Sequence, residues 1–136
     1  MIIGCRYYSL TRALTEKLGG CSDIKAVDKE MLNAFKGFCK LGAKEDEIIT
    51  LKDPTHEALE DLLAQLEALI KENWDQRGET TLIYLYYVGH GRLANGKVAI
   101  VLDTDDLLTL CWRIEEKIRA LGTMEGAYSV CLLDCS

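Results

Sequence analysis

The feature that most constrains this fold is a run of apolar and aromatic residues at positions 80–88, TTLIYLYYV. The run is rich in β-branched and aromatic residues, which favour β-strands. A strand that is covered on both faces is apolar along its whole length, whereas a half-exposed strand alternates with polar residues. The run therefore predicts a central strand that is buried on both faces of a sheet.

Segments typical of strands and of helices alternate along the rest of the chain. Short apolar segments predict strands at 1–5, 46–51, 97–102 and 127–133, and apolar residues at helical spacing predict helices at 23–40, 56–74 and 107–122. Pro54 interrupts the chain before the second helix, and Thr55 is placed to cap its first turn. We therefore expect one α/β domain over residues 1–136, with a mainly parallel sheet and helices on both faces in three layers, α-β-α.

Composition and charge argue against several kinds of partner. The net charge of −6 argues against nucleic acid and against anionic membrane surfaces, since both bind basic patches. The six cysteines include no Cys-x-x-Cys pair and the chain has only two histidines, so we expect no metal site and no cofactor. We expect reduced and mostly buried thiols, as in a cytoplasmic protein.

Reactive residues follow two of the predicted strands. In a parallel sheet the site lies at the carboxyl ends of the strands, so the residues just after each strand are candidates. The central strand is followed by Gly89, His90 and Gly91, and the last strand by Asp134, Cys135 and Ser136. Glycines allow a sharp turn that exposes the imidazole, and an imidazole can generate the reactive thiolate of a nearby cysteine.

Each of these signals also has an ordinary explanation. A histidine between two glycines can simply belong to a turn, and a single cysteine near a strand end can be there by chance. Their shared position at the ends of two strands is what favours a Cys–His dyad.

The stretches LIYLYYVGHG and YSVCLLDCS resemble the caspase–metacaspase–paracaspase superfamily of cysteine peptidases. In that family one strand ends in a histidine beside glycines, and a later strand ends in Asp or Gln, a small residue and the nucleophilic cysteine. His90 and Cys135 are 45 positions apart (135 − 90 = 45), close to the separation of about 50 in caspases. The stretches MIIGCRYY, LGGCSDIKAVDKEML and ITLKDPTHEALEDLL are similar to further parts of the same domain.

The resemblance implies a cysteine endopeptidase with His90 as the acid–base residue. The backbone N–H of Gly91, together with that of the nucleophile, would bind the oxyanion. The nucleophile itself stays open between two positions. The family pattern puts it two residues after Asp134, at Ser136, whereas Cys135 stands in the place of the small residue.

Three interpretations of this ending remain. Cys135 can be the nucleophile in a register shifted by one residue, or Ser136 can be an engineered replacement of a cysteine. Ser136 can also be natural, and the chain is then a catalytically inactive homologue that acts as a scaffold or regulatory binding module. A dyad that is built for a thiol activates a serine hydroxyl poorly.

The resemblance also implies a peptide or protein substrate with Arg or Lys at the cleaved position. Metacaspases of this specificity line their pocket with carboxylates, to which Asp134 and Asp23 correspond, and with a cysteine for which Cys21 is the candidate. Val88 replaces the serine of that pocket, and Asp23 can equally cap the first helix.

The resemblance covers the large-subunit half of the family domain. The strands and the helix that normally follow the nucleophile are absent from this sequence. We therefore expect a small-subunit segment or a partner chain to complete the sheet, because the last strand alone leaves an open edge.

Overall fold

A parallel sheet forms the centre of the protein. The computed structural model describes residues 1–5, 24–102 and 111–135, and of residues 24, 25 and 135 it describes the backbone. The strands of the main sheet lie in the order β2-β1-β3-β6 and are all parallel. They are β1 (Ile2–Gly4), β2 (Thr50–Lys52), β3 (Thr81–Gly89) and β6 (Ala127–Cys135). The α/β class and the mainly parallel sheet that the sequence predicts are confirmed.

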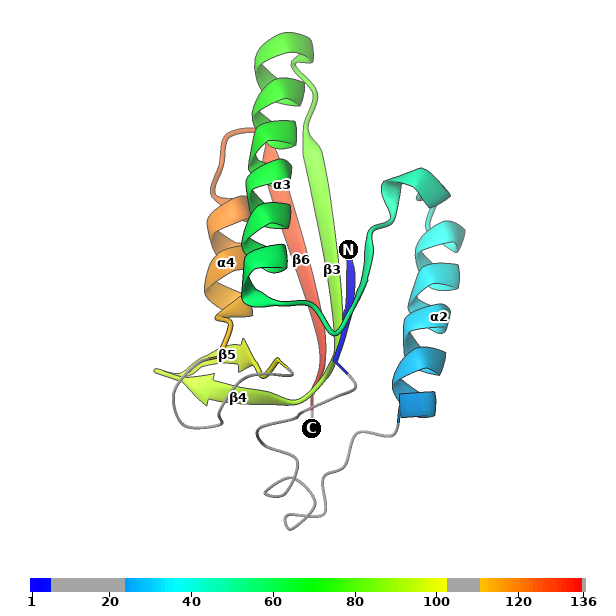
Figure 1. The fold of residues 1–136 in the computed structure, drawn as a ribbon. Helices are drawn as coiled ribbons and strands as arrows, with labels where there is room; N and C mark the ends of the chain where they lie inside the picture. The colour runs from blue at the N-terminus through cyan, green and yellow to red at the C-terminus, as the bar shows by residue number, and fades with distance from the viewer. Residues whose placement is uncertain (6–23, 103–110, 136) are drawn as a thin grey trace.

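Helices cover both faces of this sheet (Figure 1). Helix α2 (Ile24–Lys40) lies on one face, and helices α3 (His56–Arg77) and α4 (Ile114–Gly122) lie on the other. The described part of the chain is therefore compatible with the three-layer arrangement that the sequence predicts. No helix in that part is both long enough and apolar enough to cross a membrane.

Strand β3 is buried because its side chains enter two cores. Leu85 and Tyr87 have no exposed surface and pack with residues of α3 and α4. On the other face Val88 is buried in the core that α2 forms, and Tyr84 and Tyr86 pack against it. Burial on both faces explains the apolar residues from Ile83 to Val88 and confirms a central strand there, whereas Leu82 near its start is 55% exposed.

Helix α3 begins as predicted. The Thr55 hydroxyl accepts a hydrogen bond from the Ala58 amide at 3.1 Å, and Gly78 ends the helix with a left-handed φ of 61°. The prediction that the apolar residues of this helix share one buried face is wrong at one position. Leu69 is 43% exposed and lines a cavity beside the sheet instead of the core.

The strand predicted at 46–51 is mostly a short turn. A 3-10 helix, η1 (Glu45–Glu47), precedes β2, and the Glu47 carboxylate accepts a hydrogen bond from the Lys44 amide at 3.2 Å. This side-chain contact stabilises the turn, so the extended segment begins only at Thr50.

The strand predicted at 97–102 belongs to a separate hairpin. Strand β4 (Gly91–Ala94) pairs in antiparallel fashion with β5 (Lys97–Ile100). Asn95 and Gly96 connect them with φ values of 54° and 77°. Positive φ at both central residues is what a two-residue hairpin turn requires, so β5 folds back onto β4 and does not extend the main sheet.

The helix predicted at 107–122 begins later, at Ile114. Trp112 lies in an extended bridge, and its N–H and C=O exchange hydrogen bonds of 3.0 and 2.8 Å with Ile100. The Trp112 indole also donates to the Glu60 carboxylate at 2.9 Å, which ties this segment to α3. The first residues of the predicted helix, 107–110, lie outside the described residues.

Candidate functional site

Two strand ends meet at the carboxyl edge of the sheet. Strands β3 and β6 pair with Val88 opposite Asp134 and Gly89 opposite Cys135. Paired strands lie about 4.8 Å apart, and His90 follows Gly89 directly. The backbones of His90 and Cys135 are therefore neighbours at one sheet edge, which is the placement that the strand ends predict.

Both strands end later than the sequence predicts. Gly89 belongs to β3, and Asp134 and Cys135 belong to β6 rather than to a loop after it. The register is unbroken from the first pair of the ladder to the last. Asp134 and Cys135 are thus held by ladder pairing, which makes their position at the edge well defined.

The backbone of His90 is fixed from two sides. Its carbonyl oxygen accepts a hydrogen bond from the Tyr87 hydroxyl at 2.6 Å and another from the Val101 amide at 3.1 Å. Gly89 has a φ of 150°, in the region that favours glycine. The His90 side chain is half-buried, and its Nε2 atom is buried. These contacts turn the chain after β3 and keep His90 at the edge of the sheet.

Gly91 directs its backbone N–H away from the hairpin. It lies opposite Ile100, whose own N–H and C=O are bonded to Trp112. In an antiparallel ladder such a pair is of the non-hydrogen-bonded type, so the backbone groups of both residues point outward. The Gly91 N–H can therefore donate to a group outside the hairpin.

The hairpin after His90 is anchored to helix α4. The Glu115 carboxylate accepts a hydrogen bond from the Val98 amide at 2.7 Å, and this bond is the main reason why the pKa of Glu115 is lowered. The hydrogen bond from Trp112, followed by that from Lys117, lowers the pKa of Glu60 on α3. The segments on both sides of the hairpin are thus tied to the helices that cover the sheet.

Asp134 places a carboxylate on the α2 side of the same edge. It is exposed, and its Oδ2 atom accepts a long hydrogen bond of 3.4 Å from the Tyr86 hydroxyl. Burial, followed by the negative charges of Asp134 and Glu30, raises the pKa of Tyr86 to about 12. The charges of two carboxylates therefore act on Tyr86 at this end of the sheet.

Replacing Asp134 by asparagine is expected to lower the pKa of Tyr86, because a negative charge that disfavours tyrosinate is removed. Folded Tyr86 keeps its proton to a higher pH than an unfolded tyrosine, so the free energy of unfolding should fall between pH 10 and about 12. Absorbance titration of tyrosinate measures the change in the pKa of Tyr86. The Tyr86→Phe variant identifies which part of the absorbance change comes from that residue. Asp61→Asn, on exposed α3 surface, is the matched control. A Tyr86 titration in Asp134→Asn that is identical to that of the unaltered protein would contradict the interaction between Asp134 and Tyr86.

Three of the predicted site residues, Cys21, Asp23 and Ser136, lie outside the described residues. The structure brings His90, Gly91, Asp134 and the backbone of Cys135 to one edge. Val88, where the family pattern has a serine, is buried in the core on the α2 side.

Sequence reasoning missed the residues that hold this edge together. Tyr87 binds the His90 carbonyl, and nothing in the apolar run distinguishes it from the neighbouring tyrosines. The Cys5 amide donates to the Val88 carbonyl at 3.1 Å, and the Asp53 amide donates to the Gly4 carbonyl at 2.8 Å. Asp53 has a φ of 48°, and the pair Asp53-Pro54 is a sequence signal of a turn there.

The described cysteines and acidic residues show no metal centre. No three side chains of His, Cys, Asp or Glu gather as a bound ion would require, within the ranges that the structure describes. The thiols of Cys5, Cys39, Cys111 and Cys131 form no disulfide with one another.

A comparison with models of known protein families and a search of curated proteins both find no match for this chain. The chemistry available at this edge is that of its own residues. These supply an imidazole, a backbone donor, a carboxylate and the end of a strand that carries a cysteine.

Proposed function

We propose that this chain is the large-subunit half of a caspase-like cysteine endopeptidase domain. The observation that carries the proposal is the pairing of Gly89 with Cys135, which sets the backbone of a cysteine beside a histidine between glycines. The strand order and the helices on both faces of the sheet are compatible with it. The resemblance of the two strand-end motifs supplies the family.

In the proposed reaction His90 accepts the proton of the nucleophile, which is the Cys135 thiol or the side chain at position 136. The thiolate of a cysteine attacks the carbonyl carbon of the peptide bond, and the carbon–nitrogen bond breaks as His90 gives its proton to the leaving amine. Water then hydrolyses the thioester and restores the thiol. The Gly91 N–H, directed out of the hairpin, donates to the oxyanion together with the N–H of the nucleophile.

The proposed substrate carries Arg or Lys at the cleaved position. Asp134 holds an exposed carboxylate at the edge, and Asp23 is proposed to add a second one with Cys21 beside it. The charges of Asp134 and Glu30 act on the same tyrosine, so the potential has the sign that attracts a guanidinium and repels a carboxylate.

A small-subunit segment or a partner chain is proposed to pair with β6. Among the described strands, β6 lies at the end of the sheet and pairs with β3 alone. Tyr128, Val130 and Leu132 on β6 are 65%, 36% and 48% exposed, and Leu82 beside them on β3 is 55% exposed. An apolar open edge is a template for another strand. A cytoplasmic location, with no membrane or nucleic acid as partner, belongs to the same proposal.

The alternative is a catalytically inactive homologue that binds partners as a scaffold. The exposed apolar side chains of β6 favour it, because a binding surface needs no nucleophile. Ser136 favours it as well, since a hydroxyl is hard to activate in a site built for a thiol.

The full-length protein, with any sequence that follows residue 136, is expected to cleave fluorogenic peptides that have Arg or Lys at the cleaved position. The peptides should differ in that residue alone, with Asp and Ala as the comparisons. We expect the Asp peptide to react at least about tenfold more slowly, because an acidic pocket repels its carboxylate. A preference for Asp would contradict the proposed pocket. A folded protein that cleaves none of the peptides would exclude the peptidase and leave the scaffold.

A further inference from the structure

The carbonyl of His90 and the N–H of Gly91 belong to one peptide unit, which lies where β3 passes into β4. The peptide bond between the two residues is trans. In a planar trans peptide the C=O and the N–H point in opposite directions. Whatever fixes the direction of the His90 carbonyl therefore also fixes the direction of the Gly91 N–H.

Two groups hold the His90 carbonyl. The Tyr87 hydroxyl donates to it at 2.6 Å, at the short end of the range for such bonds, and the Val101 amide donates to it at 3.1 Å. Val101 directly follows β5, so its bond draws the carbonyl toward the strand that pairs with β4. The Gly91 N–H consequently points away from β5, in agreement with the pairing of Gly91 with Ile100.

The peptide unit depends on such contacts because Gly91 does not restrain it. Glycine adopts positive and negative φ about equally readily, so a half-turn of the unit between His90 and Gly91 meets little resistance from Gly91 itself. After such a half-turn the carbonyl oxygen, instead of the N–H, would point outward. The negative end of the peptide dipole would then face the oxyanion and repel the charge that the site is proposed to stabilise.

Tyr87 is placed to prevent this half-turn. Its side chain has no exposed surface and packs in the core between the sheet and helices α3 and α4. Close packing leaves the ring little freedom, so the hydroxyl holds the carbonyl in one direction. The accepted hydrogen bonds also polarise the amide, and this makes the N–H on its other side a stronger donor.

We propose that Tyr87 is a positioning residue of the candidate active site. Its hydroxyl holds the peptide unit between His90 and Gly91 in the orientation that directs the Gly91 N–H to the oxyanion. This role rests on the proposed function, in which Gly91 is an oxyanion donor. Tyr87 acts through the backbone and does not touch the substrate, so its effect falls on the transition state, where the oxyanion forms.

Tyr87→Phe tests this role, because it removes the hydroxyl and keeps the ring in the core. In the full-length protein we expect kcat for an Arg peptide to fall at least about fivefold with KM unchanged. This loss is smaller than the factor of about 10² to 10³ that removal of an oxyanion donor itself costs.

A peptide aldehyde with Arg at its end gives a second measure. The nucleophile adds to the aldehyde carbon, and the aldehyde oxygen takes the position of the oxyanion. In Tyr87→Phe the inhibition constant of this compound should therefore rise at least about fivefold, as expected for a mimic of the transition state. An inhibition constant does not depend on the amount of folded protein, so partial unfolding of the variant cannot produce the rise.

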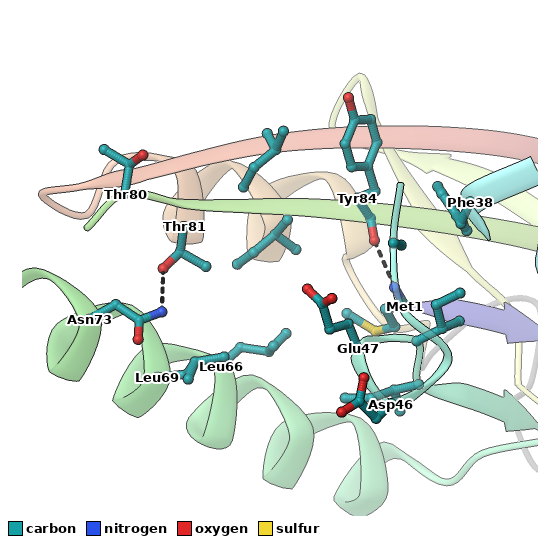
Figure 2. Close-up of a pocket in the computed structure, with 15 residues that line it drawn as sticks. Met1, Phe38, Asp46, Glu47, Leu66, Leu69, Asn73, Thr80, Thr81 and Tyr84 are labelled. Carbon is teal, nitrogen blue, oxygen red and sulfur yellow. Dashed lines mark hydrogen bonds between the residues drawn. The ribbon is translucent and has the colours of Figure 1, made fainter. Parts of the chain in front are cut away.

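Tyr84→Phe is the matched control and should change neither kcat nor the inhibition constant. It removes a hydroxyl from the same strand, but Tyr84 packs against the core on the α2 side. Figure 2, a view of the cavity that Leu66 and Leu69 line, shows the Tyr84 ring on the side of β3 opposite α3. If the protein cleaves the peptide and Tyr87→Phe gives the same values as Tyr84→Phe, the role of Tyr87 is overturned.

Nuclear magnetic resonance separates the orientation of the peptide unit from the proposed activity. Loss of an accepted hydrogen bond should move the ¹³C resonance of the His90 carbonyl and the ¹⁵N resonance of Gly91 upfield in Tyr87→Phe, and neither should move in Tyr84→Phe. Unchanged resonances in Tyr87→Phe would overturn the proposed orientation whether or not the protein is active. If the resonances move but the unaltered protein cleaves no peptide, Tyr87 orients the peptide unit, and the proposed function and its catalytic use of that unit both fail.

Discussion

Replacing His90 by alanine is expected to lower kcat/KM for an Arg peptide at least about 100-fold in the full-length protein. Acid–base catalysis by a positioned side chain typically accelerates a reaction by about 10²- to 10⁴-fold. The chain has one other histidine, His56, in the first turn of α3. His56→Ala is therefore a matched control and should keep the activity of the unaltered protein. Equal losses in the two variants would contradict a catalytic role for His90.

The same assay separates the two nucleophile positions. If Cys135 is the nucleophile, Cys135→Ala should abolish cleavage and Ser136→Cys should add little. If position 136 is the nucleophile, Ser136→Cys should create or greatly raise activity, and His90→Ala in that background should remove it. Activity that is retained in the Cys135→Ala variant and also in the His90→Ala variant would exclude the Cys–His dyad.

Replacing Gly126 by alanine is expected to destabilise the fold by about 2–4 kcal/mol, the sum of a left-handed residue and an overpacked contact. Gly126 has a φ of 76°, and a Cβ atom there would lie 2.6 Å from the Trp74 ring. Its carbonyl accepts the hydrogen bond from the Thr81 amide that begins the β3–β6 pairing. The effect therefore falls on the turn that starts β6 and sets its register.

Gly78→Ala is the control for this measurement. Gly78 also has a positive φ, of 61°, but a Cβ atom there would meet nothing within 4 Å. Its expected cost is therefore about 1–2 kcal/mol, from backbone conformation alone. Urea unfolding gives both values, and losses of equal size would show that the contact with Trp74 does not contribute.

The sequence contains a recognisable signal for the hairpin, although only a strand at 97–102 is predicted from it. Asn95-Gly96 between short apolar segments is a strong signal of a two-residue hairpin turn. The apolar character of 97–102 predicts a strand, but composition alone does not tell which strand a segment pairs with. The late start of α4 has the same origin, since the bridge between Ile100 and Trp112 joins residues that are distant in sequence.

The sequence by itself determined the central strand, the helices on both faces and the meeting of His90 and Cys135 at one edge. Burial on both faces leaves a continuous apolar run, helical packing leaves a periodic one, and parallel strands end at the same edge. The tertiary structure alone decided the pairing of Gly89 with Cys135, the hydrogen bond from Tyr87 to the His90 carbonyl and the cavity beside β3. Each of these depends on how two segments that are distant in sequence are positioned relative to one another. The local sequence of one segment does not specify which residues of the other it will contact.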